Sequence, residues 1–248
     1  MLKAVSTSTW ISVKTMRLNF MQYLMMVIVF PATYLIISIV SSGGLKSAAD
    51  YALGLFCSMS ISIFINMQSA SIALSNGITT IEMYATFKVR PIFVFLGQSI
   101  FHFIMMLPFA FALVALALLS GIAINLPALL GVLILSFLFL SFVSIVVGGI
   151  IPNPNMAGPI INMLYMVIVM ITPLYNDLSS VSNTSRILYS LNPFSHYTSL
   201  LYSCFNKPPV CPPYISIAVL FGLTVIAAII SVKRWKNAAA VEKLNVLG

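Results

Sequence analysis

Charged residues are scarce in this sequence of 248 residues. They make up 6% of the chain, whereas hydrophobic residues make up 60%. No soluble domain of this length could keep so much apolar surface away from water, so the composition indicates a membrane protein. The four carboxylates are the rarest charges, and all lie at or beyond the ends of apolar runs: Asp50, Glu82, Asp177 and Glu242. A proton-driven pump usually needs an ionisable group at mid-membrane, and His102 alone is a weak candidate for that role.

The sequence also lacks the common motifs for nucleotide binding, metal binding, redox chemistry and hydrolysis. The sequence has no G-x-x-x-x-G-K-[ST], H-E-x-x-H, C-x-x-C or G-x-S-x-G. Its two histidines, His102 and His196, fall in different predicted layers and make no plausible metal site. The sequence therefore predicts no catalytic residue, no metal site, no cofactor bound by this chain and no enzyme activity.

Six apolar runs predict an all-α integral membrane fold in a single domain. The predicted spans cover about residues 20–41, 51–75, 91–119, 128–151, 157–175 and 214–232. An even number of spans places both termini on one side, together with nine lysines and arginines, against three on the other side. The positive-inside rule then predicts cytoplasmic termini in a multi-pass protein of the cell membrane. The net charge of +8 is spread over span ends, a distribution that favours membrane orientation over nucleic-acid binding.

Residues 1–19 have an amphipathic pattern. At 100° per residue, one side carries Lys3, Lys14 and Arg17, and the other carries mostly apolar residues. This pattern predicts a helix in the headgroup plane that contacts membrane lipid. The alternative is an unstructured basic leader.

Three polar residues inside the predicted spans are candidates for a substrate path: Asn66, Gln98 and His102. Asn66 belongs to a stripe of small or polar residues in the second span, which is also typical of close helix packing. A packing role therefore remains an alternative for all three residues.

Two segments between spans have a character of their own. Residues 76–90 predict a short cytoplasmic helix, although an ordinary polar loop is an alternative. In residues 176–211, Asn192-Pro193 predicts a helix start, and the apolar stretch Phe194–Phe205 is too short to span, as in a re-entrant or interfacial helix. Cys204 and Cys211 fall on the predicted outer face, where either a disulfide or two unpaired thiols is compatible with the sequence.

Two stretches carry a family resemblance, namely Ile81-Glu82-Met83-Tyr84-Ala85-Thr86-Phe87-Lys88-Val89-Arg90-Pro91 and Ser190-Leu191-Asn192-Pro193-Phe194-Ser195-His196-Tyr197. With the six-span layout, they resemble a type-2 ATP-binding-cassette exporter permease. One departure is the end of the fifth span, where Ile171-Thr172-Pro173-Leu174-Tyr175 keeps only the proline of the family pattern.

The resemblance implies a half-transporter that pairs with a second permease, identical or not. A separate P-loop ATPase subunit would hold the ATP and Mg²⁺. The implied coupling residues are Thr79, Thr80, Glu82, Met83 and Tyr84, and the implied extracellular gate residues are Asn192, Pro193, Phe194 and Tyr197.

The substrate is less well defined by the sequence. The third to fifth spans are rich in Phe, Met and Leu, which favours an apolar or amphipathic passenger such as a drug, hydrophobic peptide or lipid. These side chains could instead face lipid. The competing class is a non-transporting immunity or sensor protein, which would lack an ATPase partner.

Overall fold

The computed structural model describes residues 2–18, 21, 24–29, 32–33, 36–37, 39–40, 45–75, 90–151, 153–174 and 183–245. Every regular element in these ranges is a helix. The elements are α1 (Leu2–Leu18), η1 (Met25–Val29), α4 (Leu45–Ile61), η2 (Ser62–Gln68), α5 (Ser69–Leu74), α7 (Pro91–Leu119), α8 (Leu126–Ile150), α9 (Pro154–Ile171), α10 (Asn183–Ser190), α11 (Pro193–Cys204) and α12 (Pro213–Asn245).

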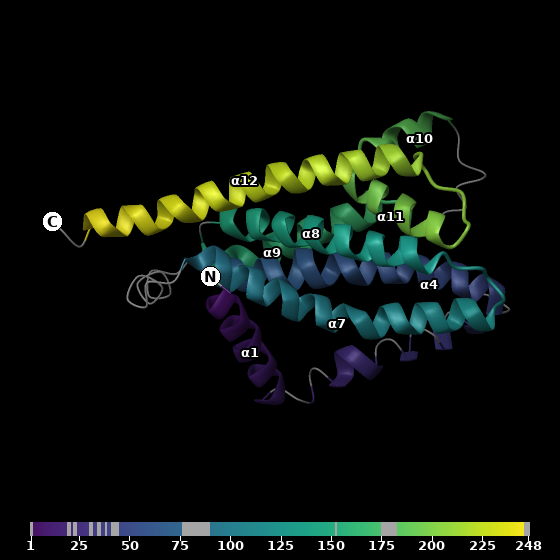
Figure 1. The fold of residues 1–248 in the computed structure, drawn as a ribbon, viewed down its shortest axis with the longest axis horizontal. Helices are drawn as coiled ribbons and strands as arrows, with labels where there is room; N and C mark the ends of the chain where they lie inside the picture. Colours follow the sequence, from purple (N-terminus) through teal and green to yellow (C-terminus); the bar gives the residue numbers. More distant parts are fainter. Residues whose placement is uncertain are drawn as a thin grey trace.

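The long helices form a bundle with their axes roughly side by side (Figure 1). Among the described residues, five helical segments are long and apolar enough to cross a membrane: Ala48–Leu74, Pro91–Leu119, Leu126–Ile150, Pro154–Ile171 and Pro213–Trp235. They correspond to the second to sixth predicted spans, and the chain is therefore a multi-pass membrane protein. The first predicted span, residues 20–41, is described only in short separate pieces, and residues 76–89 of the predicted coupling segment lie outside the described residues.

Asparagine and proline together set several helix starts. The Asn125 side chain accepts a hydrogen bond from the Ala128 N–H at the start of α8, and Asn153 accepts one from the Asn155 N–H at the start of α9. In each helix a proline follows within the first two positions, where its missing N–H costs nothing. Proline also opens α7 at Pro91, where the third span was predicted to begin.

The second span is one continuous helical run with an irregular middle. Its central seven residues, η2, form a π-helix between α4 and α5. On either side of η2 the neighbours differ: α4 packs against α7 and α11, whereas α5 packs against α8 and α9. Close approach to α8 depends on Gly148, where an added Cβ would lie 2.5 Å from the Ser69 carbonyl oxygen.

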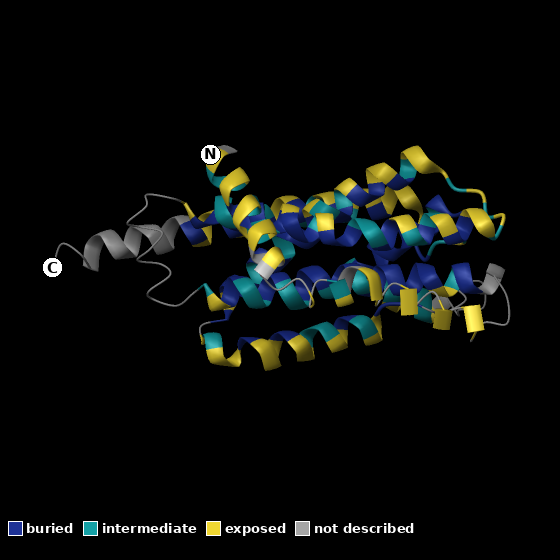
Figure 2. Ribbon diagram, turned by 90° about the horizontal axis from the view of Figure 1, so that it is seen from below, coloured by how far each residue is buried: buried dark blue, intermediate teal, exposed yellow. Residues whose placement is uncertain are grey.

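The core lies between the helices, and the outer faces of the bundle are apolar and exposed. Figure 2 shows buried residues along the inner faces and exposed residues along the outer faces of α9 and α1. The largest fully buried side chains include Phe64, Phe95, Phe139 and Tyr197 from four different helices. Exposed apolar residues such as Met163 and Met170 of α9 suit contact with lipid or with another membrane subunit.

Two predicted features differ in extent from the structure. The last span was predicted over 214–232, close to the apolar segment Pro213–Trp235, and the helix α12 continues beyond that segment to Asn245. The reason is that lysine and arginine end a hydrophobic span without breaking a helix, since both are good helix formers. The segment from Phe194 was predicted as re-entrant or interfacial, and in the structure ten of the twelve residues of α11 are buried against the bundle.

Candidate functional site

The predicted coupling residues lie in the part of the chain that the structure does not describe. Thr79, Thr80, Glu82, Met83 and Tyr84 therefore remain predictions. The flanks of the segment are described: α5 ends at Leu74, and α7 begins at Pro91 after an extended Arg90. Both flanks lie at the end of the bundle from which the C-terminal part of α12 extends (Figure 1).

Asn192 connects the start of α11 to the end of α9. Its Oδ1 accepts a hydrogen bond from the Phe194 N–H at 3.0 Å, as predicted for a helix cap. Its Nδ2 donates to Thr172 Oγ1 at 2.9 Å and to the Ile171 carbonyl at 3.3 Å. The side chain is 8% exposed, so these bonds are shielded from water and fix α11 against α9.

The other predicted gate residues lie in the core of the subunit. Phe194 packs edge-on against Phe139 of α8, with ring centroids 5.6 Å apart, and Tyr197 is fully buried. Pro193 occupies the first position of α11, as predicted. Side chains buried in this way reach a substrate only if α11 itself moves, so a gating role would belong to the helix as a unit.

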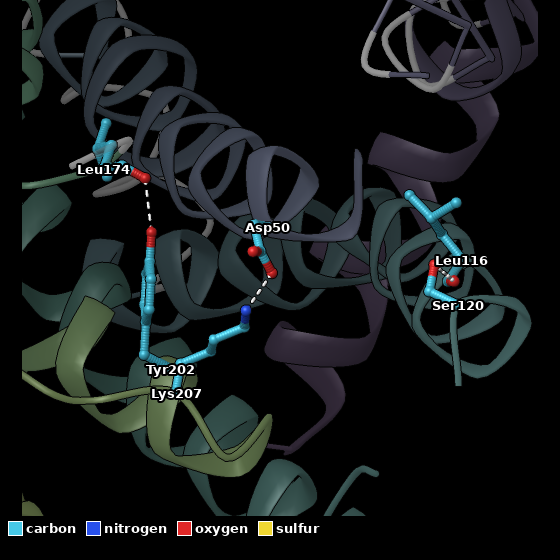
Figure 3. Close-up of polar contacts among 6 residues, drawn as sticks. All are labelled: Asp50, Leu116, Ser120, Leu174, Tyr202 and Lys207. Carbon is cyan, nitrogen blue, oxygen red and sulfur yellow. Dashed lines mark hydrogen bonds and ion pairs between the residues drawn. The ribbon is translucent and has the colours of Figure 1, made fainter. Parts of the chain in front are cut away.

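The C-terminal end of α11 is tied to two other parts of the bundle (Figure 3). The Tyr202 hydroxyl donates to the Leu174 carbonyl at 2.7 Å, and Lys207 forms an ion pair with Asp50 of α4 at 2.5 Å. The Asp50 side chain is 47% exposed and that of Lys207 25% exposed. Solvent therefore screens this pair, and it contributes about 1 kcal/mol or less.

His196 is a functional candidate that the sequence did not single out. Its Nε2 donates to the Ser190 carbonyl of α10 at 2.9 Å, and its Nδ1 lies 3.1 Å from Ser216 Oγ of α12. With the proton on Nε2, Nδ1 accepts from the serine hydroxyl. This histidine therefore links three helices, and its place four residues after the helix cap is the signal that could have found it.

Cys204 and Cys211 are separate buried thiols in the structure. Burial raises the pKa of both thiols above the usual value, so they are protonated and slow to react at neutral pH. The Cys204 thiol donates to the Leu200 carbonyl at 3.3 Å. A disulfide between the two in an oxidising compartment stays a prediction.

The predicted path residues lie on two neighbouring helical segments. Asn66 belongs to η2 and is half-buried, whereas Gln98 and His102 belong to α7. The His102 Nδ1 donates to the Gln98 carbonyl one turn back at 2.8 Å.

A fully buried glutamine was missed by the sequence analysis. Gln68 of η2 donates from Nε2 to Ser99 Oγ of α7 at 2.5 Å. Oε1 of Gln68 and Oε1 of Gln98 are both shielded from water and have no hydrogen-bond partner in the described part of the chain. This interface between the second and third spans therefore keeps spare acceptor capacity.

The amphipathic helix α1 is attached to α7 by hydroxyl groups. Ser8 Oγ donates to the Val94 carbonyl at 2.8 Å, and Thr9 Oγ1 contacts the Gly97 carbonyl at 3.0 Å. Gly97 makes room for this contact, because an added Cβ would lie 2.6 Å from the Val5 carbonyl oxygen. The large apolar residues Trp10 and Ile11 instead point outward, with about 60% of each exposed.

Among the described residues, no group of three or more His, Cys, Asp and Glu side chains is placed to hold a metal ion.

Comparison with known proteins gives the family. A search of curated proteins finds no match. A model of the ABC-2 type transporter family matches residues 1–206, which include α1, every span but the last, and the hairpin of α10 and α11. The chain belongs to the ABC-2 type transporter family and is a membrane component of an ATP-binding-cassette transporter.

Proposed function

We propose that this chain is the membrane subunit of an exporter, driven by a separate P-loop ATPase, for apolar or amphipathic molecules such as drugs, hydrophobic peptides or lipids. The family match over residues 1–206 carries the proposal. Because the sequence has no nucleotide-binding loop, ATP and Mg²⁺ would bind to the partner subunit.

Residues 76–90 are the proposed contact with the ATPase, with Glu82 as the main polar contact and Thr79, Thr80, Met83 and Tyr84 around it. The segment joins the end of α5 to the start of α7. Arg90 directly precedes α7, and Lys233 and Arg234 directly precede Trp235, which packs against Phe95 near the start of α7. These three cations therefore lie near one end of the bundle, which favours a cytoplasmic position under the positive-inside rule. Closure of the ATPase on ATP would move this segment and, through it, the two helices that it joins.

The proposed substrate path lies between this chain and a second permease, identical or related. Exposed apolar faces that could pair within the membrane support this arrangement, above all the methionines of α9. Asn66, Gln98 and His102 are the proposed polar points along the path. Asn192, Pro193, Phe194 and Tyr197 would hold α11 as a closure at the outer end.

The test is the Glu82→Ala variant, assembled with the ATPase in proteoliposomes. We expect the complex to co-purify, while transport and transport-coupled ATP hydrolysis fall about fivefold or more, as coupling energies of 1–3 kcal/mol predict. Asp177→Ala is the matched control, because it removes a carboxylate on the predicted opposite side. Unchanged coupling in Glu82→Ala would refute the assignment of residues 76–90, and the absence of any ATPase partner would favour the immunity or sensor class.

A further inference from the structure

A groove of about 620 Å³ runs along the outer side of α1 where this helix meets α7. It is lined by Lys3, Ser6, Thr9, Trp10 and Val13 of α1 and by Ile100 of α7. Lys3 and Trp10 are exposed, so the groove opens to the surroundings of the protein.

The groove lies where headgroups meet acyl chains. The hydrogen bonds of Ser8 to Val94 and of Thr9 to Gly97 hold α1 against the first two turns of α7. With 29 residues, α7 is about 43 Å long, which exceeds a hydrocarbon thickness of about 30 Å. The charged residue Arg90 directly before α7 favours a headgroup position for its first turns. Figure 1 shows α1 at a steep angle to the long helices instead of running along them.

The lining has two chemistries. Lys3 stands at one end of the groove, and near the other end Lys14 Nζ lies 5.6 Å from the centre of the Trp10 ring. Between them, Trp10, Val13 and Ile100 give an apolar floor. Cations at headgroup level beside an apolar surface complement a negatively charged headgroup with an acyl chain attached.

No described carboxylate competes for these two lysines. Asp50 is the only acidic side chain whose placement the structure describes, and it pairs with Lys207 at the other end of the bundle. Within the described part of the chain, Lys3 and Lys14 therefore have no acidic side chain as a partner.

We infer that the groove between α1 and α7 binds an anionic phospholipid, with the phosphate near Lys3 or Lys14 and an acyl chain against Trp10, Val13 and Ile100. The lipid would contact both helices at once and so add to an attachment that already includes close packing at Gly97 and two hydroxyl bonds. The inference does not depend on the proposed transport activity.

The fluorescence of Trp10, and its quenching by brominated lipids, provides the test. The chain has two tryptophans, and the other, Trp235, is 3% exposed and packs edge-on against Phe95. In a Trp235→Phe background, the full chain is placed in nanodiscs of phosphatidylcholine and phosphatidylglycerol, with brominated acyl chains on one lipid or the other. We expect brominated phosphatidylglycerol to quench Trp10 at a several-fold lower share of the bilayer than brominated phosphatidylcholine does.

The lysine variants assign the preference to the groove. Lys3→Gln and Lys14→Gln should each weaken it, by up to about fivefold per lysine, which corresponds to about 1 kcal/mol per cation near a membrane surface. Lys14→Arg should retain it, and Lys233→Gln, which removes a charge from α12, should leave it unchanged. In a Trp10→Phe protein the remaining Trp235 should show no preference.

Equal quenching by the two brominated lipids in the protein with both lysines would overturn the inference. A preference that survives the double variant Lys3→Gln/Lys14→Gln would do so as well. Because Lys14→Arg keeps both the helix and the charge, a loss of folding in the glutamine variants can be separated from a loss of lipid binding.

Discussion

The short helices α1 and α11 lie toward opposite ends of the bundle and are held to it in different ways. Ten of the twelve residues of α11 are buried, whereas Ser8 is the one buried residue among the described side chains of α1. Burial of apolar side chains holds α11, with capping and hydroxyl bonds added. Close packing along α7, with Gly97 at the contact and two hydroxyl bonds added, holds α1. The comparison indicates that α11 belongs to the folding core, while α1 is a peripheral element that depends on its surroundings.

The largest expected effect is on the α11 side of this comparison. Tyr197→Ala removes a fully buried aromatic ring and should lower the free energy of unfolding by about 3–5 kcal/mol. Thermal unfolding in detergent can be followed by the reactivity of Cys57, which is fully buried. Trp10→Ala on α1 is the control and should change stability by about 0.5 kcal/mol or less, because the ring is 60% exposed. Similar losses in the two variants would remove the distinction between the helices.

The next effect concerns the contact that holds α1. Gly97→Ala places a methyl group against the Val5 carbonyl and should destabilise the α1 contact by about 1–3 kcal/mol. The position of the Trp10 emission maximum and the melting temperature report the change. Gly131→Ala in α8 is the matched control, because nothing lies within 4 Å of an added Cβ there. It should be neutral or stabilising by up to about 1 kcal/mol, and an equal loss in both variants would argue against close packing at Gly97.

Variants of the capping residue Asn192 measure how much the polar contacts of α11 contribute, apart from its buried apolar side chains. Asn192→Ala removes the bonds to Phe194, Thr172 and Ile171 and should cost about 1–2 kcal/mol in the same melting assay. Asn192→Ser keeps a capping oxygen but is too short to reach α9, so it should recover part of the loss. If serine recovered the full stability, the link to Thr172 would contribute nothing.

The smallest effect belongs to the exposed ion pair. A double-mutant cycle with Asp50→Asn and Lys207→Gln should give a coupling energy of about 0.2–1 kcal/mol, because both side chains reach solvent. The coupling should fall as salt rises. A coupling above 2 kcal/mol, or one that does not change with salt, would instead place this pair within the core that holds α11.

The sequence predicted well what depends on local chemistry. Pro91 begins α7 and Asn192-Pro193 begins α11, because proline and a capping asparagine act on their own backbone neighbours. Spans two to six were placed to within a few residues, because the length of an apolar run reflects the thickness of the bilayer. The family predicted from two short stretches was confirmed by the match over residues 1–206.

Features that depend on contacts between distant residues were not predictable. Neither Gly97 nor Ser8 indicates alone that α1 rests on α7, since the contact joins positions 89 residues apart. The extent to which α11 is buried was not predicted either, because a mixed stretch of twelve residues reads the same at a membrane interface and in a protein core. The roles of the coupling, gate and path residues stay predictions, because they depend on partners and on motion.

The π-helical turn η2 has a consequence for the direction of the chain. A residue that is additional to the 3.6 of an α-helical turn rotates everything after it by about 100°. The second span can therefore present one face to α7 and α11 before η2, in α4, and a different face to α8 and α9 after η2, in α5. Removing one residue from Ser62–Gln68 would remove this rotation and turn Ser75 by about 100° about the helix axis. The π-helix η2 therefore sets the direction in which Ser75 faces.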